Sequence, residues 1–303
     1  MSPTDDGPKS SSGEPARGSL AGPGSRWTIG TGVQIVLAGS LLLLLILPLV
    51  ALLTSIPPAQ IVSAASDPGI RTSLEFTLLA SAISLAIILG LGVPLGYVLA
   101  RRRFPGRSVV ESAVTLPIVL PHLIGGLALL LLFAPSAPVG ALAIRAGFPV
   151  FDTIWGVVLV MVYVSASYTV LASQVAFQSV NEPLLEAARS LGASPSEAFA
   201  SVTLPIAARG ILAGALLSWA RSVSEIGGFL ILAYAVYPSA PYSGPVTTPI
   251  SVYVYNLYQI GDLNGASAAA SFLVLAAFVV FLAVRILSRH GGGLWRRIAL
   301  GVP

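Results

Sequence analysis

Two opposite charges stand inside a long apolar stretch of this sequence, where ionisable side chains are rare. Arg221 and Glu225 are four residues apart within the run 207–236, so a helix would place them on one face. An unpaired charge inside a membrane span costs several kcal/mol, whereas a neutralised pair costs less. The pair therefore either packs helices together or lines a path for a charged solute, and Gly227 and Gly228 beside it allow close backbone approach.

A third ionisable group, His122, lies in another apolar run. Pro117 and Pro121 precede it, and Gly125 and Gly126 follow it. Proline interrupts the hydrogen bonds of a helix, and broken helices in membrane proteins surround cavities. We expect the imidazole either to bond to a backbone carbonyl or to contact a passing anion.

Patterns typical of catalytic sites are nearly absent. Lys9 is the only lysine, so no Gly-x-x-x-x-Gly-Lys phosphate loop exists to bind ATP, and no His-Glu-x-x-His pattern or cysteine offers a metal site. Gly265-Ala266-Ser267, with His122 as a partner, superficially resembles the Gly-x-Ser of rhomboid-type intramembrane proteases, but small residues in a span more often serve helix packing. We therefore expect no catalytic residue, no metal and no cofactor bound by this chain.

The composition is that of a membrane protein. Hydrophobic residues make up 55% of the 303 residues and charged residues 9%, whereas about a quarter of the residues in soluble domains are charged. A helix needs about 20 apolar residues to cross the hydrocarbon core. The sequence predicts an all-α membrane protein with six spans, at about 33–56, 74–99, 109–134, 154–177, 207–236 and 266–287.

The basic residues predict the orientation of these spans, because arginine and lysine near span ends stay in the cytoplasm. With a cytoplasmic N-terminus, thirteen of the sixteen basic residues lie inside, only Arg71 and Arg145 lie outside, and Arg221 is within a span. The basic balance thus reflects topology in the cell membrane and not a nucleic-acid partner. The thirteen are Lys9, Arg17, Arg26, Arg101, Arg102, Arg103, Arg107, Arg189, Arg209, Arg285, Arg289, Arg296 and Arg297.

The domain organisation follows from the same pattern. Residues 1–32 are expected to be a disordered cytoplasmic tail, since they hold too few bulky apolar residues to repay ordering. Residues 33–287 form the six-span domain, and 288–303 a cytoplasmic C-terminal tail. The first apolar run is long enough to span, so we expect an anchor in place of a cleaved signal.

A polar, helix-compatible segment separates the fourth and fifth spans. Asn181 or Glu182 is placed to cap a first short helix, and Gly192 ends it. Ser194 and Glu197 then form the capping-box pattern that starts a second one. The segment is therefore predicted to be two short helices joined by a glycine turn, in the cytoplasm.

This segment resembles the EAA loop of binding-protein-dependent ABC transporter permeases. In that family the loop forms a coupling helix in a groove of the cytoplasmic ATPase. The resemblance implies a homodimer of six-span subunits in membrane lipid, with two ATPase chains that use ATP and an extracytoplasmic substrate-binding protein, working by alternating access. The matching residues are Glu186, Ala187, Ala188, Gly192, Leu204 and Pro205, with Val202 where the family has Ile.

Two further segments resemble permeases for sulfate, molybdate and tungstate. In the fifth span Glu225 and Gly227 match the pattern of an acidic residue followed closely by a small one. In the third span Pro121-His122 stands where many relatives have Pro-Pro. The resemblance implies import of an oxyanion, tungstate or molybdate, with sulfate or another small solute as the alternative. Candidates for the path are Arg221, Glu225, Gly227 and His122.

The loop after the fifth span departs from the tungstate-type pattern, because it is longer and rich in tyrosine. The rings are expected either at the lipid headgroups or in a docking surface for the binding protein. Within this loop, 250–258 is expected to be a short helix along the membrane interface. The tyrosines are Tyr234, Tyr237, Tyr242, Tyr253, Tyr255 and Tyr258.

A secondary transporter is the rival from another class. Such proteins usually carry internal repeats and several ion-coupling acids within their spans. Here only Glu225 lies deep in a span, and the polar segment has no second copy. These features favour a transporter that draws its energy from a separate subunit.

Overall fold

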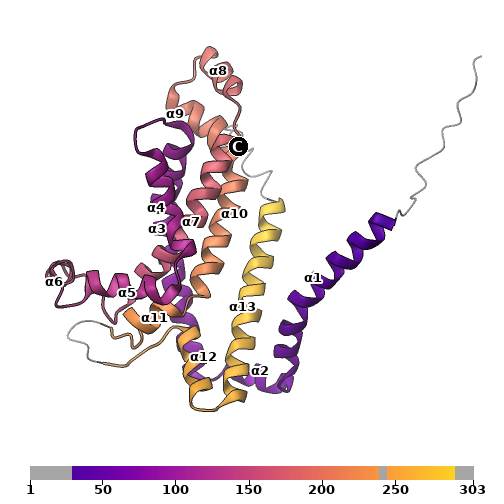
Figure 1. Ribbon diagram of the computed structural model, residues 1–303, viewed down its shortest axis with the longest axis vertical. Coiled ribbons are helices and arrows are strands. Elements are labelled where there is room, and N and C mark those ends of the chain that lie inside the picture. Colours follow the sequence, from indigo (N-terminus) through magenta and orange to yellow (C-terminus); the bar gives the residue numbers. More distant parts are fainter. Residues whose placement is uncertain (1–28, 239–243, 291–303) are drawn as a thin grey trace, which may run out of the picture. The chain divides into compact units, whose positions relative to one another are not determined.

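The computed structural model describes residues 29–238 and 244–290, and this part of the chain is helical apart from loops and two isolated β-bridges (Figure 1). The first helix, α1 (Ile29–Thr54), exposes every described side chain from 32 to 50. The described residues up to Val50 form one unit, and those from Ala51 onward form a second. The predicted tails, apart from a few residues at their inner ends, and Tyr242 lie outside the described residues and stay predictions.

The second unit contains helices long enough to cross a membrane and shorter connecting helices. Together with α1, five described helical segments have sufficient length and apolarity, or six if one bent pair counts as a single span. The long helices are α3 (Pro68–Arg101), α7 (Ile154–Gln178), α10 (Leu204–Val223) and α13 (Leu263–His290), and the bent pair is α4 (Arg107–Val119) and α5 (His122–Phe133). The short ones are α2 (Pro58–Ala64), α6 (Pro138–Arg145), α8 (Glu182–Ser190), α9 (Pro195–Ala198), the π-helical turn Phe199–Thr203, α11 (Gly227–Leu232) and α12 (Ile250–Gln259).

The third predicted span, 109–134, is broken into α4 and α5, which differ in direction by 115°. Pro121 explains the break, because proline lacks an amide hydrogen and drives the preceding Leu120 into an extended conformation, with ψ 133°. Pro117 lies inside α4 without ending it. The interruption that the prolines predicted is confirmed, and one of the two causes it.

The predicted bounds of the fifth span, 207–236, are wrong at both ends. The helix begins earlier, since α9, the π-helical turn and α10 form one helical segment from Pro195 to Val223. It ends earlier because the Glu225 carboxylate accepts a hydrogen bond from the amide of Gly228 in the first turn of α11 and so favours a new helix start.

Helices α3, α7 and α10 run side by side and form the centre of the second unit (Figure 1). Glycine lets them approach closely: a β-carbon at Gly96 would lie 2.8 Å from a side-chain atom of α7, and one at Gly214 would lie 2.5 Å from the Ala172 β-carbon. The Trp219 indole of α10 also donates to the Ser81 hydroxyl of α3, at 3.1 Å. This packing fixes the ends of α10, where the candidate residues lie.

The short helix predicted at 250–258 is confirmed as α12, which extends to Gln259. Its first amide, at Ile250, donates to the Thr77 hydroxyl of α3 at 2.9 Å, and Val252 is fully buried. The helix therefore packs on α3 and on α13. Its position along a membrane interface stays a prediction.

Candidate functional site

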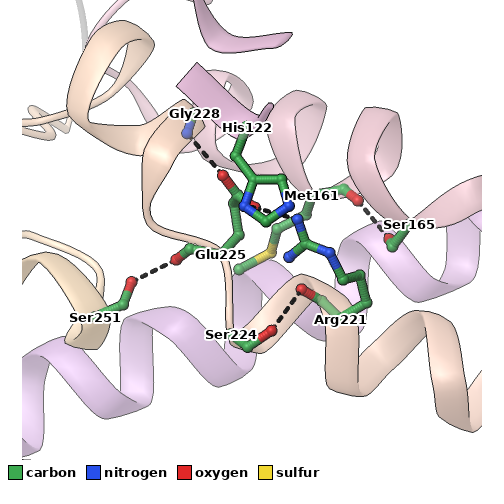
Figure 2. A network of polar contacts seen from close by, with 8 residues as sticks. All are labelled: His122, Met161, Ser165, Arg221, Ser224, Glu225, Gly228 and Ser251. Carbon is green, nitrogen blue, oxygen red and sulfur yellow. Dashed lines mark hydrogen bonds and ion pairs between the residues drawn. The ribbon is translucent and has the colours of Figure 1, made fainter. Parts of the chain in front are cut away.

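A buried polar cluster lies where α10, α11 and α5 meet, and Glu225 is its centre (Figure 2). The Glu225 side chain is 0% exposed. Its Oε2 atom accepts a hydrogen bond from Arg221 Nη2 at 2.7 Å, and its Oε1 atom accepts one from the Gly228 amide at 2.7 Å. The predicted pairing of Arg221 and Glu225 is thus confirmed, although Glu225 lies in the link after α10 and not within the helix.

His122, the first residue of α5, also belongs to this cluster. Its Nδ1 atom lies 3.6 Å from Glu225 Oε2. The expected bond from this imidazole to a backbone carbonyl is not the contact that the structure shows. About half of the histidine side chain, 48%, is exposed, whereas the Arg221 side chain is 15% exposed.

Glycines allow α5 and α11 to meet closely enough for this contact. A β-carbon at Gly227 would lie 2.8 Å from the His122 β-carbon, and one at Gly126 would lie 2.7 Å from the Gly228 α-carbon. A larger residue would push α11 away from α5. The candidate Gly227 therefore belongs to the site by its size, since it brings the imidazole to the carboxylate.

Asp152 and Ser251 contribute to this region without any signal in the sequence. The Ser251 hydroxyl donates to the backbone carbonyl of Glu225 (Figure 2), so α12 holds the link from the opposite side. Asp152 has an unusual positive φ of 49°, and its amide donates to the Leu232 carbonyl at 3.1 Å. Contacts between residues so far apart in sequence leave no periodic trace, which is why sequence analysis missed them.

The Asp152 carboxylate anchors the chain that follows α11. It accepts hydrogen bonds from the backbone amides of Tyr234 and Ala235, and the Asp152 carbonyl accepts one from Tyr237 at 2.9 Å. Burial raises the pKa of this carboxyl above its ordinary value, and the two backbone bonds act in the opposite direction. Asp152 therefore keeps α11, and with it Gly228, in place.

The cluster combines one guanidinium with one buried carboxylate. A guanidinium offers several donors to a carboxylate or to another oxyanion, and here one of them is engaged by Glu225. With neutral imidazole, Arg221 and Glu225 sum to zero charge, and protonation of His122 would add one positive charge. Among the described residues no group of three His, Asp or Glu side chains could hold a metal ion.

The 182–203 loop, which comprises α8, α9 and the π-helical turn, carries the second set of candidates. The glycine turn and the capping box are confirmed: Gly192 has φ 93°, the Ser194 amide donates to Glu197 Oε2 at 2.7 Å, and the Glu197 amide donates to Ser194 Oγ at 3.3 Å. No atom lies within 4 Å of a β-carbon placed at Gly192. Glycine is thus required for its backbone conformation and not for space.

Two details of the predicted loop differ. Asn181 is the N-cap of α8 but makes no side-chain capping bond. The second helix is not a separate short helix, because α9 continues through the π-helical turn into α10, which begins at Leu204-Pro205.

The exposed face of the loop combines charge with apolar side chains. Glu186 and Ala187 are exposed, whereas Leu185 is buried and Ala188 is half-buried. Leu191, at the turn, is 91% exposed.

The two sets of candidates lie at opposite ends of α10 (Figure 1). The eighteen residues from Leu204 to Arg221 correspond to about 25 Å of helix. The structure does not bring the loop and the polar cluster together, but the rigid helix between them connects the two.

Comparisons with known proteins show which family of proteins this chain resembles. The family model of the binding-protein-dependent transport system inner membrane component matches residues 92–290. A molybdate/tungstate transport system permease protein of Thermococcus kodakarensis is 41% identical over 226 residues, which are 75% of this chain and 82% of that protein. A probable molybdenum ABC transporter permease protein of Haloferax volcanii is 36% identical over 259 residues, 86% of this chain and 91% of the other.

A solved structure shows the same fold. A chain in the crystal structure of a bacterial alginate ABC transporter, in complex with an alginate pentasaccharide-bound periplasmic protein, matches with a TM-score of 0.64 and 20% identity. The match covers 88% of this chain and 98% of that one. At this identity the likeness concerns the fold alone.

Proposed function

Because the chain belongs to the family of binding-protein-dependent transport system inner membrane components, we propose that it is the permease subunit of an ABC importer for an oxyanion, molybdate or tungstate. The observation that carries the substrate class is the likeness, at up to 41% identity, to permease proteins named for molybdate/tungstate or molybdenum. Sulfate stays the alternative, since it is also a tetrahedral dianion.

The polar cluster supports transport of an anion. Arg221 lies at the end of α10 that is remote from the 182–203 loop, and the Glu225 carboxylate occupies one of its donors. A doubly charged oxyanion on the path would compete with Glu225 for these donors. We therefore assign Arg221, Glu225, Gly227 and His122 to the translocation path.

The 182–203 loop supports coupling to an ATPase. Glu186, Ala187 and the projecting Leu191 form an exposed surface at one end of the bundle, and the loop continues into α10 without a break. In the proposed cycle two copies of the chain bind two cytoplasmic ATPases, which use ATP to bring the loops together. Each α10 carries this motion to its own Arg221–Glu225 pair.

A docking surface for the substrate-binding protein is proposed at the opposite end of the bundle. Tyr234 and Tyr258 are 44% and 60% exposed there, and the exposed Ile260 follows Tyr258 in the turn after α12. Rigid aromatic rings give contact area at little cost in conformational entropy.

Reconstitution tests this function. Proteoliposomes that contain this chain, its ATPase and the binding protein are expected to import labelled molybdate or tungstate only with hydrolysable ATP and only with the binding protein. Excess sulfate distinguishes the alternative, because it suppresses uptake only if sulfate is also a substrate. Uptake that follows an ion gradient without ATP would instead indicate a secondary transporter.

A further inference from the structure

Three consecutive arginines, Arg101 to Arg103, stand at the C-terminal end of α3, and among the described residues only the side chain of the first has polar partners. The Arg101 side chain is 21% exposed, whereas Arg102 and Arg103 are exposed residues. Arg101 Nη2 donates to the Val180 carbonyl at 2.9 Å, and Nη1 lies 3.1 Å from Glu182 Oε2. A single guanidinium therefore binds two points of the junction between α7 and α8.

This junction is the entry to the 182–203 loop. Val180 is 2% exposed, and Glu182 is the first residue of α8. The Nε atom of Arg101 is buried without a hydrogen-bond partner in the described part of the chain. A buried N–H group without a partner costs free energy. The two bonds of the planar guanidinium to acceptors in fixed directions hold the side chain in this position despite that cost.

An aromatic contact joins the same end of α3 to the exit of the loop. The Tyr97 ring, one turn before Arg101, packs edge-on against Phe177 and against Phe199, with 5.1 Å between ring centroids in both cases. Phe199 begins the π-helical turn that leads into α10. The last turn of α3 thus contacts both ends of the loop, although α3 is not adjacent to it in the sequence.

The N-terminal half of α3 is linked to the polar cluster through the first residues of α12. The Thr77 hydroxyl accepts from the Ile250 amide at 2.9 Å, and the next residue, Ser251, donates to the Glu225 carbonyl. Thr77 and Arg101 are twenty-four positions apart, which corresponds to about 36 Å of helix. Helix α3 therefore offers a second connection between loop and cluster, parallel to the covalent one through α10.

We propose that Arg101 is a positioning residue for energy coupling: it makes α3 move together with the 182–203 loop when the ATPase displaces that loop. The inference rests on the proposed function. Without Arg101, the loop would still displace α7 and α10, to which it is joined covalently, but α3 would follow only through the aromatic contact and through its packing against those two helices. ATP would then be hydrolysed without full opening of the path.

The test measures the number of ATP molecules hydrolysed per anion imported in the reconstituted transporter. Arg101→Gln is expected to raise this ratio about fivefold, the effect of a loss of about 1 kcal/mol in an equilibrium. Arg101→Lys keeps the charge but not the fork, and should fall between wild type and Arg101→Gln. Glu182→Gln should change the ratio less than about twofold, because that carboxylate is half exposed and its ion pair is weak.

Arg102→Gln is the matched control, since it removes an exposed neighbouring charge. An Arg101→Gln protein that reaches the membrane and keeps the wild-type ratio would overturn the proposal. Absence of ATP-driven uptake in the wild type would instead contradict the proposed function itself.

A second measurement does not depend on turnover. The chain has no cysteine, so spin labels at Arg102→Cys and Ser190→Cys report the distance between the end of α3 and the loop in the full transporter. A narrow distance distribution that broadens on Arg101→Lys is expected. An unchanged distribution would show that Arg101 does not hold the two together.

Discussion

At the scale of the residue, Glu225 has more partners than its charge pair with Arg221 alone. The amide of Gly228 donates to its Oε1 atom, and His122 lies near its Oε2 atom. Removal of one partner would strand the other charge in a region of low dielectric, whereas removal of both charges leaves none to stabilise. Single and double substitutions of Arg221 and Glu225 therefore distinguish a structural role of this pair from a role in transport.

The first prediction concerns Arg221→Gln and Glu225→Gln, alone and together. Each single change should lower stability by about 3 kcal/mol or more, and the double change by less than either. If Arg221 attracts the anion, the double variant should reach the membrane in normal amount yet import at least about tenfold less oxyanion, a difference of about 1.4 kcal/mol. Uptake normalised to the amount of protein in the membrane measures this.

The exposed pair Arg71–Glu75 is the control, because it has the same spacing with side chains 69% and 64% exposed. Its double neutralisation should change neither stability nor uptake noticeably. Full uptake in the Arg221–Glu225 double variant would leave helix packing as the only role of that pair.

Asp152 gives a prediction with a defined pH dependence. Burial raises the pKa of this carboxyl in the folded protein. Its contribution to the free energy of unfolding is therefore complete below the ordinary pKa of about 4, and it is lost as the pH rises through the raised pKa of the folded state. Asp152→Asn keeps an acceptor and tolerates a positive φ, so this variant should lose that pH dependence and be at least as stable at neutral pH.

Thermal unfolding in detergent over a pH series measures this effect. Asp152→Ala should be destabilised by about 1–3 kcal/mol, because alanine has no acceptor for the amides after α11. If the asparagine variant loses as much stability as the alanine variant at neutral pH, then the two amide bonds need the charged carboxylate.

At the scale of the element, the 182–203 loop depends on one backbone conformation. Gly192→Val should uncouple ATP hydrolysis from import while the protein still inserts, because a β-branched residue at φ 93° is strained by about 1–3 kcal/mol. Gly192→Asn, which tolerates that conformation better, should be milder. Co-purification of the ATPase and uptake are the two measurements, and wild-type values for the valine variant would contradict a docking role of the loop.

The close approach of α5 and α11 gives a second prediction at this scale. A β-carbon at Gly126 would lie 2.7 Å from the Gly228 α-carbon, whereas none of the atoms considered lies within 4 Å of one at Gly90. Gly126→Ala should therefore destabilise the protein and move His122 away from Glu225, and Gly90→Ala should be neutral or slightly stabilising. Thermal unfolding and uptake compare the two, and equal behaviour would mean that α5 and α11 separate without cost.

At the scale of the whole molecule, topology decides whether the loop faces the ATPase. Ser66 precedes α3 and Ser196 lies in the loop, and both are exposed. In intact cells Ser66→Cys should react with an impermeant thiol reagent and Ser196→Cys should be shielded, since the native chain has no cysteine to interfere. The reverse labelling pattern would place the loop outside the cell and contradict coupling to a cytoplasmic ATPase.

The sequence by itself determined the features that depend on neighbours along the chain. The apolar runs predicted the spans, Pro121 predicted the break, and Gly192 with Ser194 and Glu197 predicted the turn and the capping box. These features are readable because a helix satisfies its backbone groups within one segment, and caps act over three or four residues.

Only the tertiary structure decided which groups surround Glu225. The carboxylate binds the Gly228 amide locally, but His122 and Ser251 come from helices distant in sequence, and Arg101 reaches Val180 across seventy-nine positions. Such contacts depend on how closely whole helices approach one another. Glycines that face other helices control this distance, and the periodicity of a single segment does not reveal it.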